Sequence, residues 1–236
     1  FYLANRLYGV TFRPITAPRY HKECTVYQVL DHDQSHVGVL YIDPYPRKEK
    51  SGGAWCGNFT EQRYVDGERK APVVGIVCNF TPPTGDTPSL LSFDEAETMF
   101  HEFGHALHNF MRDVKYSGAS GVERDFVELP SQINEHWAFE PEVLAVYAKH
   151  YKTGEPLPQE LLDKYNAASQ YGQGFATVEY LAASYVDMDL HVLTSVPADL
   201  EVMKFEEKKL AERGIPRQIQ PRYRVTNFSH TMGGGY

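Results

Sequence analysis

The sequence has few cysteines, no long apolar run and fewer positive than negative charges. Its three cysteines, Cys24, Cys56 and Cys78, are dispersed and form no C-x-x-C pair, which argues against a disulfide framework. No apolar run approaches the ~20 residues that cross a bilayer, so we expect no membrane segment. Lysine and arginine number 23 against 31 acidic residues, a net charge of -8, and they form no stripe. We therefore expect no nucleic-acid partner.

Both ends of the sequence look cut. It opens on Phe1 without a methionine, a basic n-region or an apolar h-region, so no targeting segment is visible. It stops at Tyr236, directly after a run of three glycines. We therefore expect a fragment whose partners include the missing N- and C-terminal portions of its parent chain. We expect a cytoplasmic location, with the periplasm as the alternative because the N-terminus is missing.

The first 80 residues contain short runs rich in β-branched and aromatic residues, separated by turn formers. They predict a small N-terminal β-sheet over 1–80, with strands at 8–12, 25–30, 37–42 and 73–78. The charged and glycine-rich stretch 48–53 fits an exposed turn that leads into an edge strand at Ala54-Trp55.

The pattern changes to helices in the segment 92–236. Ser92 and Glu95 form a capping box, and apolar residues then recur every three to four positions, which predicts a helix over 93–111. Further helices are predicted at 130–151, 158–171, 174–193 and 198–213. Strands followed by helices indicate a single α+β unit, mainly helical, over 1–236.

The predicted helix 93–111 contains an H-E-x-x-H pattern at 101–105. At 3.6 residues per turn, His101 and His105 lie only ~40° apart around the helix axis, so both imidazoles can reach one ion. Glu102 lies beside them, where a carboxylate can take a proton from a metal-bound water without coordinating the metal itself. The pattern predicts one catalytic Zn²⁺ per chain.

A catalytic zinc takes three protein ligands, so a third must come from elsewhere in the chain. Glu128, at the start of the next predicted helix, is our choice, with Asp125 as the alternative ligand. Asp125 and Glu97 are also candidates for orienting a ligand histidine. His108, one turn beyond His105, is expected to be a packed or solvated histidine and not a ligand.

Two stretches carry a strong family resemblance, Phe100–His108 and Arg124–Gln132. Together they resemble the thimet oligopeptidase family of zinc peptidases, whose catalytic core has a zincin-like fold. The segments 133–137 and 147–158 look like the peptidyl-dipeptidase branch, which comprises dipeptidyl carboxypeptidases. The similarity extends from 43–55 to 228–236 and so spans nearly the whole chain.

The resemblance implies the same zinc ligands and general base as the spacing argument. It also implies that His230 and Tyr236 hydrogen-bond the substrate and steady the oxyanion. The backbone of Gly53 and Ala54 is similar to the edge on which these enzymes bind the substrate as an added strand. Family members also carry a helical N-terminal portion and a tyrosine-rich helix after the glycine run, and this sequence contains neither.

The predicted function is zinc-dependent hydrolysis of oligopeptides with release of C-terminal dipeptides. An endo-acting oligopeptidase of the same family is the alternative among enzymes. The alternative from another class is a noncatalytic zinc-binding helical module. A structural zinc site usually has four ligands that include cysteine, and no cysteine lies near the His-Glu helix in sequence.

Overall fold

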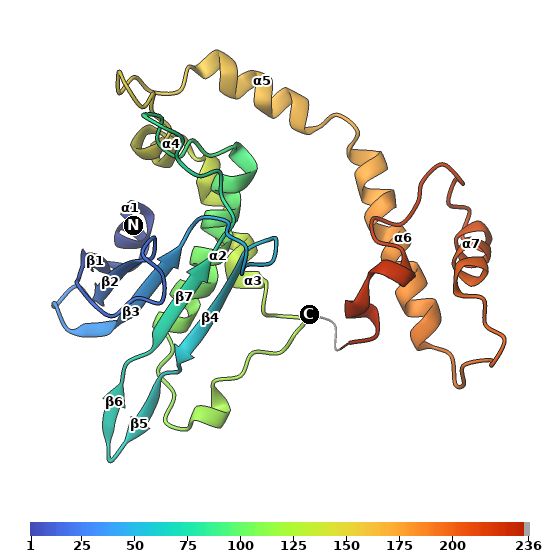
Figure 1. Ribbon diagram of the computed structural model, residues 1–236, viewed down its shortest axis with the longest axis horizontal. Coiled ribbons are helices and arrows are strands. Elements are labelled where there is room, and N and C mark those ends of the chain that lie inside the picture. The colour runs from blue at the N-terminus through green and yellow to red at the C-terminus, as the bar shows by residue number, and fades with distance from the viewer. Residues whose placement is uncertain (234–236) are drawn as a thin grey trace. The chain divides into compact units, whose positions relative to one another are not determined.

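The computed structural model describes residues 1–233, and the chain divides into two compact units, Phe1–Leu157 and Pro158–Tyr236 (Figure 1). Among these described residues, no helix combines the length and the apolar character needed to cross a membrane. Helices together with a small mixed sheet fit the predicted α+β class.

The first unit contains the sheet and the helices around it. Its elements are α1 (Tyr2–Tyr8), β1 (Thr11–Pro14), β2 (Thr25–Leu30), β3 (His36–Asp43), β4 (Trp55–Thr60), β5 (Arg63–Val65), β6 (Glu68–Lys70), β7 (Val73–Val77), α2 (Phe93–Phe110), η1 (Ser117–Ala119), α3 (Leu129–His136), η2 (Trp137–Phe139) and α4 (Pro141–Tyr147). The five-stranded sheet has the order β1-β2-β3-β7-β4, in which only β3 and β7 are parallel. Strand β4 is therefore an edge of this sheet.

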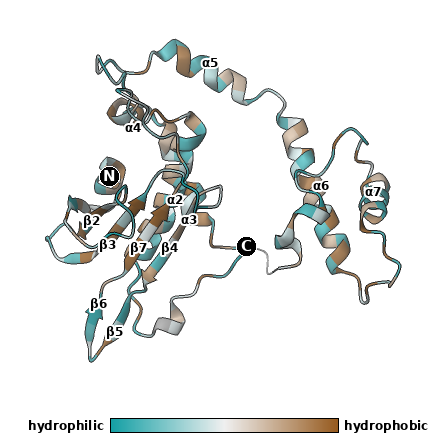
Figure 2. Cartoon of the chain, in the orientation of Figure 1, coloured by the Kyte–Doolittle hydropathy of each residue, from teal (hydrophilic) through white to brown (hydrophobic). Residues whose placement is uncertain are grey.

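Helix α2 packs against the sheet and forms the core with it. Its capping box is present, because Ser92 Oγ accepts from Glu95 N and Glu95 Oε2 accepts from Ser92 N. Phe103, Leu107 and Phe110 on its apolar face join buried residues of the strands, among them Val29, Leu40, Val74 and Ile76. Figure 2 shows hydrophobic colouring on β3 and β7 and hydrophilic colouring on the β5–β6 hairpin. This packing fixes α2 against the sheet.

The structure corrects two of the predicted elements in the first unit and adds a hairpin. The strand predicted at 8–12 begins only at Thr11, because Tyr8 ends helix α1 and Gly9 takes the left-handed conformation that ends it. The helix predicted at 130–151 is two helices, because Pro141 has no N–H and Glu140 before it is extended. The hairpin β5–β6, with its turn at Asp66-Gly67, was not predicted, although Asp-Gly is a strong turn signal.

The second unit is helical, with α5 (Gln159–Ser169), α6 (Gln173–His191), α7 (Val202–Glu212), η3 (Val225–Asn227) and η4 (Ser229–Thr231). Ala182 and Val186 of α6 pack against Leu210 of α7. The buried Glu206 accepts from Arg224 Nε at 2.7 Å and from Val225 N at 3.2 Å. These bonds attach the C-terminal segment to α7.

Candidate metal centre

His101 and His105 of α2 meet Glu128, which immediately precedes α3. The Nε2 atoms of both histidines lie 3.1 Å from Glu128 Oε2. Each residue offers one ligand atom, and these atoms lie within 4.8 Å of one another. The two imidazole rings are nearly perpendicular, at 84°. The group chosen from spacing and motif is therefore brought together as one cluster.

Close packing of α3 against α2 brings Glu128 to the histidines. A Cβ atom added at Gly104 would lie 2.7 Å from Pro130 O and 2.7 Å from Ser131 Cα. Glycine at this position of the H-E-x-x-H motif thus lets the backbone of α3 approach the axis of α2. Asn134 Nδ2 donates to Phe100 O at 2.6 Å and joins the two helices one turn further along.

The ligand residues have further hydrogen-bond partners on α3. Glu135 Oε1 lies 2.5 Å from His101 Nδ1, so its carboxylate orients the imidazole from the side away from Nε2. Ser131 Oγ donates to Glu128 Oε2 at 2.7 Å. Glu128, Ser131 and Glu135 are spaced three and four residues apart and therefore lie on one side of α3.

Glu135 was not singled out in the sequence, where Asp125 and Glu97 were the candidates for orienting a histidine. Glu135 follows Glu128 by seven residues, about two turns of a helix, and this spacing indicates that both lie on one side of α3.

Asp125 is exposed and is not part of the His-His-Glu group within residues 1–233. Burial, together with the nearby carboxylate of Glu135, raises the pKa of Glu97. His108 also lies outside the group, and burial lowers its pKa.

Glu102 is a buried carboxylate next to the His-His-Glu group. It is 5% exposed, and its Oε2 has no hydrogen-bond partner within the described chain. Burial raises the pKa of Glu102 to about 7, the charge of His101 opposes this, and that of Glu128 adds to it. A carboxyl group with a pKa near neutrality suits proton transfer in both directions.

The donor set fits a divalent transition metal. Two imidazole nitrogens and one carboxylate oxygen are ligands that catalytic zinc sites use, and three ligands leave a position for water or substrate. Burial lowers the pKa of His105, which favours the neutral imidazole that binds metals. Glu102 Oε2 is buried and has no hydrogen-bond partner among the described residues. A water bound to the metal would donate a hydrogen bond to it.

The edge strand β4 is tied directly to the helix that carries the histidines. Asn58 Nδ2 of β4 donates to Asn109 Oδ1 at 2.8 Å, and Asn109 Nδ2 donates to His105 O at 2.9 Å. The predicted substrate-binding residues, Gly53 and Ala54, immediately precede this strand. Gly53 is exposed.

The two residues assigned to the oxyanion by resemblance lie in another part of the chain. His230 belongs to η4 of the second unit, where its ring is 5.2 Å from that of Phe228. Tyr236 lies outside the described residues. The roles of His230 and Tyr236 stay predictions.

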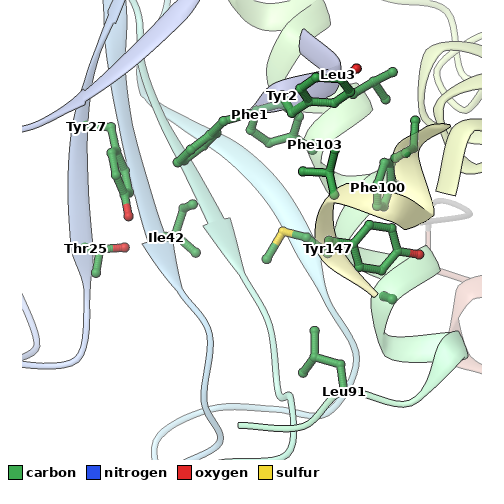
Figure 3. A pocket seen from close by; sticks show the side chains of 14 residues that line it. Phe1, Tyr2, Leu3, Thr25, Tyr27, Ile42, Leu91, Phe100, Phe103 and Tyr147 are labelled. Atoms are coloured by element: carbon green, nitrogen blue, oxygen red, sulfur yellow. The ribbon is translucent and has the colours of Figure 1, made fainter. Parts of the chain in front are cut away.

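An apolar cavity of about 440 Å³ is lined by aromatic and aliphatic side chains (Figure 3). It is lined by residues of α1, the sheet, α2 and α4, among them Phe1, Tyr27, Ile42, Phe100, Phe103 and Tyr147. None of the three candidate ligands lines it. The cavity is therefore separate from the His-His-Glu group.

Comparison with known proteins matches the whole chain. The model of peptidase family M3 matches residues 1–236. The chain is 42% identical over 240 residues to dipeptidyl carboxypeptidase of Escherichia coli and 41% identical over 240 residues to that of Salmonella typhimurium. It is 38% identical over 243 residues to oligopeptidase A of Salmonella typhimurium. Each match takes in 100% of this chain and 35% of the relative. The chain therefore belongs to peptidase family M3.

Proposed function

We propose that this chain carries the catalytic centre of a zinc peptidase, built on a zincin-like core. The observation that supports this most directly is the meeting of His101, His105 and Glu128 beside the buried, unpartnered carboxylate of Glu102. Membership of peptidase family M3 supports it independently. We further propose that the two units serve one catalytic core and that the parent protein is cytoplasmic.

In this mechanism His101 and His105 would hold zinc through their imidazole nitrogens, and Glu128 would hold it through a carboxylate oxygen. Zinc, when bound, would supply Lewis acidity, which would lower the pKa of water towards ~7 and polarise the substrate carbonyl. Glu102 accepts the proton of the attacking water and delivers it to the leaving amine. Glu135 keeps the His101 ring in its ligating orientation. His230 and Tyr236 donate hydrogen bonds to the oxyanion.

We propose that the substrates are oligopeptides and that the product is a C-terminal dipeptide. The similarity to two proteins named dipeptidyl carboxypeptidase supports this choice. The similarity to oligopeptidase A favours the alternative, an endo-acting oligopeptidase. C-terminal amidation of a substrate discriminates between them, because it should abolish dipeptide release and leave internal cleavage intact.

Metal analysis of the Glu128→Ala variant tests the site itself. The intact protein should hold about one zinc per chain, and Glu128→Ala should lose it because only two ligands remain. Asp125→Ala is the matched control and should keep the zinc. Unchanged zinc affinity in Glu128→Ala would mean that the third ligand is misassigned. Zinc held without any peptide hydrolysis by the intact protein would favour the noncatalytic module.

A further inference from the structure

The loop 44–54, which joins β3 to the edge strand β4, is built around a buried lysine. The Lys50 side chain is 6% exposed, and its ammonium donates to Asp43 O at 3.2 Å, to Tyr45 O at 2.7 Å and to Cys78 O. Asp43 ends β3, and Cys78 follows β7. The ammonium thus joins the loop to the ends of two neighbouring parallel strands.

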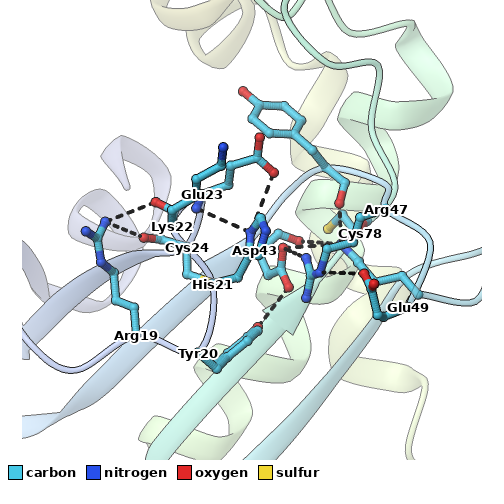
Figure 4. Close-up of polar contacts among 12 residues, drawn as sticks. Arg19, Tyr20, His21, Lys22, Glu23, Cys24, Asp43, Arg47, Glu49 and Cys78 are labelled. Atoms are coloured by element: carbon cyan, nitrogen blue, oxygen red, sulfur yellow. Dashed lines mark hydrogen bonds and ion pairs between the residues drawn. The ribbon is translucent and has the colours of Figure 1, made fainter.

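Asp43 supplies the negative charge for this lysine. Its carboxylate is buried and lies 3.3 Å from Lys50 Nζ. Arg47 Nη1 donates to it at 2.8 Å, and Tyr20 Oη donates to it at 3.0 Å (Figure 4). Burial alone would raise the pKa of Asp43, but the bonds from Arg47 and Tyr20 and the charge of Lys50 hold that pKa below its usual value. The carboxylate therefore stays ionised and paired.

A second contact holds the part of the loop next to β4. Asn79 Nδ2 donates to Ser51 O and to Gly53 O, both at 2.7 Å. Around Gly52 and Gly53 there is open space, since an added Cβ would meet no atom within 4 Å at either position. Asn79 thus holds the backbone at Ser51 and Gly53, and the side-chain positions of Gly52 and Gly53 face open space.

We propose that Lys50, Asp43 and Asn79 are positioning residues that hold the 51–54 backbone as a preformed edge for the backbone of a peptide substrate. This inference rests on the proposed peptidase function. A peptide that adds to a sheet edge binds through main-chain hydrogen bonds, so the edge must present its N–H and C=O groups in register.

The composition of the loop explains why such anchors are needed. Two consecutive glycines lose more backbone entropy on ordering than other residues do, and a mobile loop would lose this entropy each time a substrate binds. An edge ordered in advance removes that loss from the binding step. The link Asn58–Asn109–His105 O holds β4, the strand that follows the loop, and connects it to the helix that carries the two histidines.

Kinetics of the intact, zinc-loaded protein test the proposal. Asn79→Ala removes both donors, and Asn79→Asp keeps the shape but replaces the amide with an oxygen that repels the two carbonyls. Each should raise KM for an oligopeptide about tenfold while kcat changes less than about twofold, because the edge binds substrate and transition state alike. Asn5→Ala is the matched control: Asn5 Nδ2 donates to Val10 O at 3.2 Å, outside the loop, and its loss should leave KM unchanged.

A series of substrates, each N-methylated at one backbone amide, separates positioning from a general structural role. Wherever the substrate pairs with the edge, N-methylation should weaken kcat/KM about tenfold or more in the wild type and about threefold or less in Asn79→Ala. The positioning role would be overturned if N-methylation lowered kcat/KM equally in the wild type and in Asn79→Ala. It would also be overturned if Asn79→Ala had the same KM as Asn5→Ala. Neither result would contradict the proposed peptidase function. A zinc-loaded wild type that cleaves no peptide would overturn the proposed function, and this inference with it.

Discussion

At the scale of single residues, the carboxylate of Glu135 is the contact that sequence reasoning did not identify. Its Oε1 lies 2.5 Å from His101 Nδ1 and fixes the ring that presents Nε2 to the metal. Glu135→Gln keeps the shape but removes the charge, so we expect zinc affinity to fall about 10- to 100-fold. Competition with a chelator measures it. Asp125→Asn, which removes a charge from an exposed position, is the control, and equal affinities in the two variants would contradict the role of Glu135.

Glu102 makes the stability of the metal-free protein depend on pH. Burial first, and then the charge of Glu128, raises the pKa of Glu102 from 4.5 in the unfolded chain to about 7. Between these values the native state holds a proton that the unfolded chain releases, so the free energy of unfolding falls as pH rises through this window. Above pH 7 the free energy of unfolding is lower by about 3 kcal/mol because of Glu102.

Glu102→Gln removes this titration. The free energy of unfolding of the metal-free wild type should therefore fall more steeply between pH 5 and pH 8 than that of the metal-free variant. Urea denaturation of both proteins with a chelator present measures the difference. If both proteins show the same pH dependence, Glu102 does not titrate in this window and the prediction is wrong.

At the scale of elements, the approach of α3 to α2 assembles the metal group, and Gly104 permits it. In Gly104→Ala the new Cβ meets Pro130 O and Ser131 Cα, which are backbone atoms and cannot rotate away. We expect the free energy of unfolding to fall by about 1–3 kcal/mol and zinc binding to weaken as Glu128 moves. Thermal unfolding and zinc titration check this.

The control for this substitution lies in α6. Gly174→Ala adds a Cβ with no atom within 4 Å, so a helical alanine there should stabilise by up to about 1 kcal/mol. A Gly104→Ala variant that gains stability in the same way would show that α3 yields to the added methyl group without cost.

Elements defined by local signals could be predicted, and those that depend on packing could not. Helix α2 has its own capping box and apolar stripe, so its predicted bounds, 93–111, agree with Phe93–Phe110. The signals for the end of α1 at Gly9 and the break before Pro141 were present but were outweighed by the β-branched and apolar residues around them. The contacts of Gly104 and Glu135 arise only when α3 packs on α2. The seven-residue spacing places Glu135 on the side of α3 that carries Glu128, but it does not identify the histidine that Glu135 contacts.

At the scale of the whole molecule, the chain spans about a third of the length of the relatives it matches. All three candidate ligands and Glu102 lie in the unit Phe1–Leu157, whereas His230 lies in the unit Pro158–Tyr236. The H-E-x-x-H motif identified the two histidines and Glu102, and Glu128 was chosen because it lies at the start of the next predicted helix. The role of His230 rests on resemblance, because no pattern within its own segment indicates chemistry.

The most direct test of the proposed zinc peptidase is the rate at which the intact protein releases a dipeptide from an N-blocked tripeptide with a free carboxylate. Wild type and Glu102→Gln are compared at equal zinc content. The wild type should release the dipeptide, and Glu102→Gln should be slower by about 100- to 10,000-fold because no base accepts the proton of the attacking water. Equal rates in the two proteins, or no release by the zinc-loaded wild type, would contradict the account.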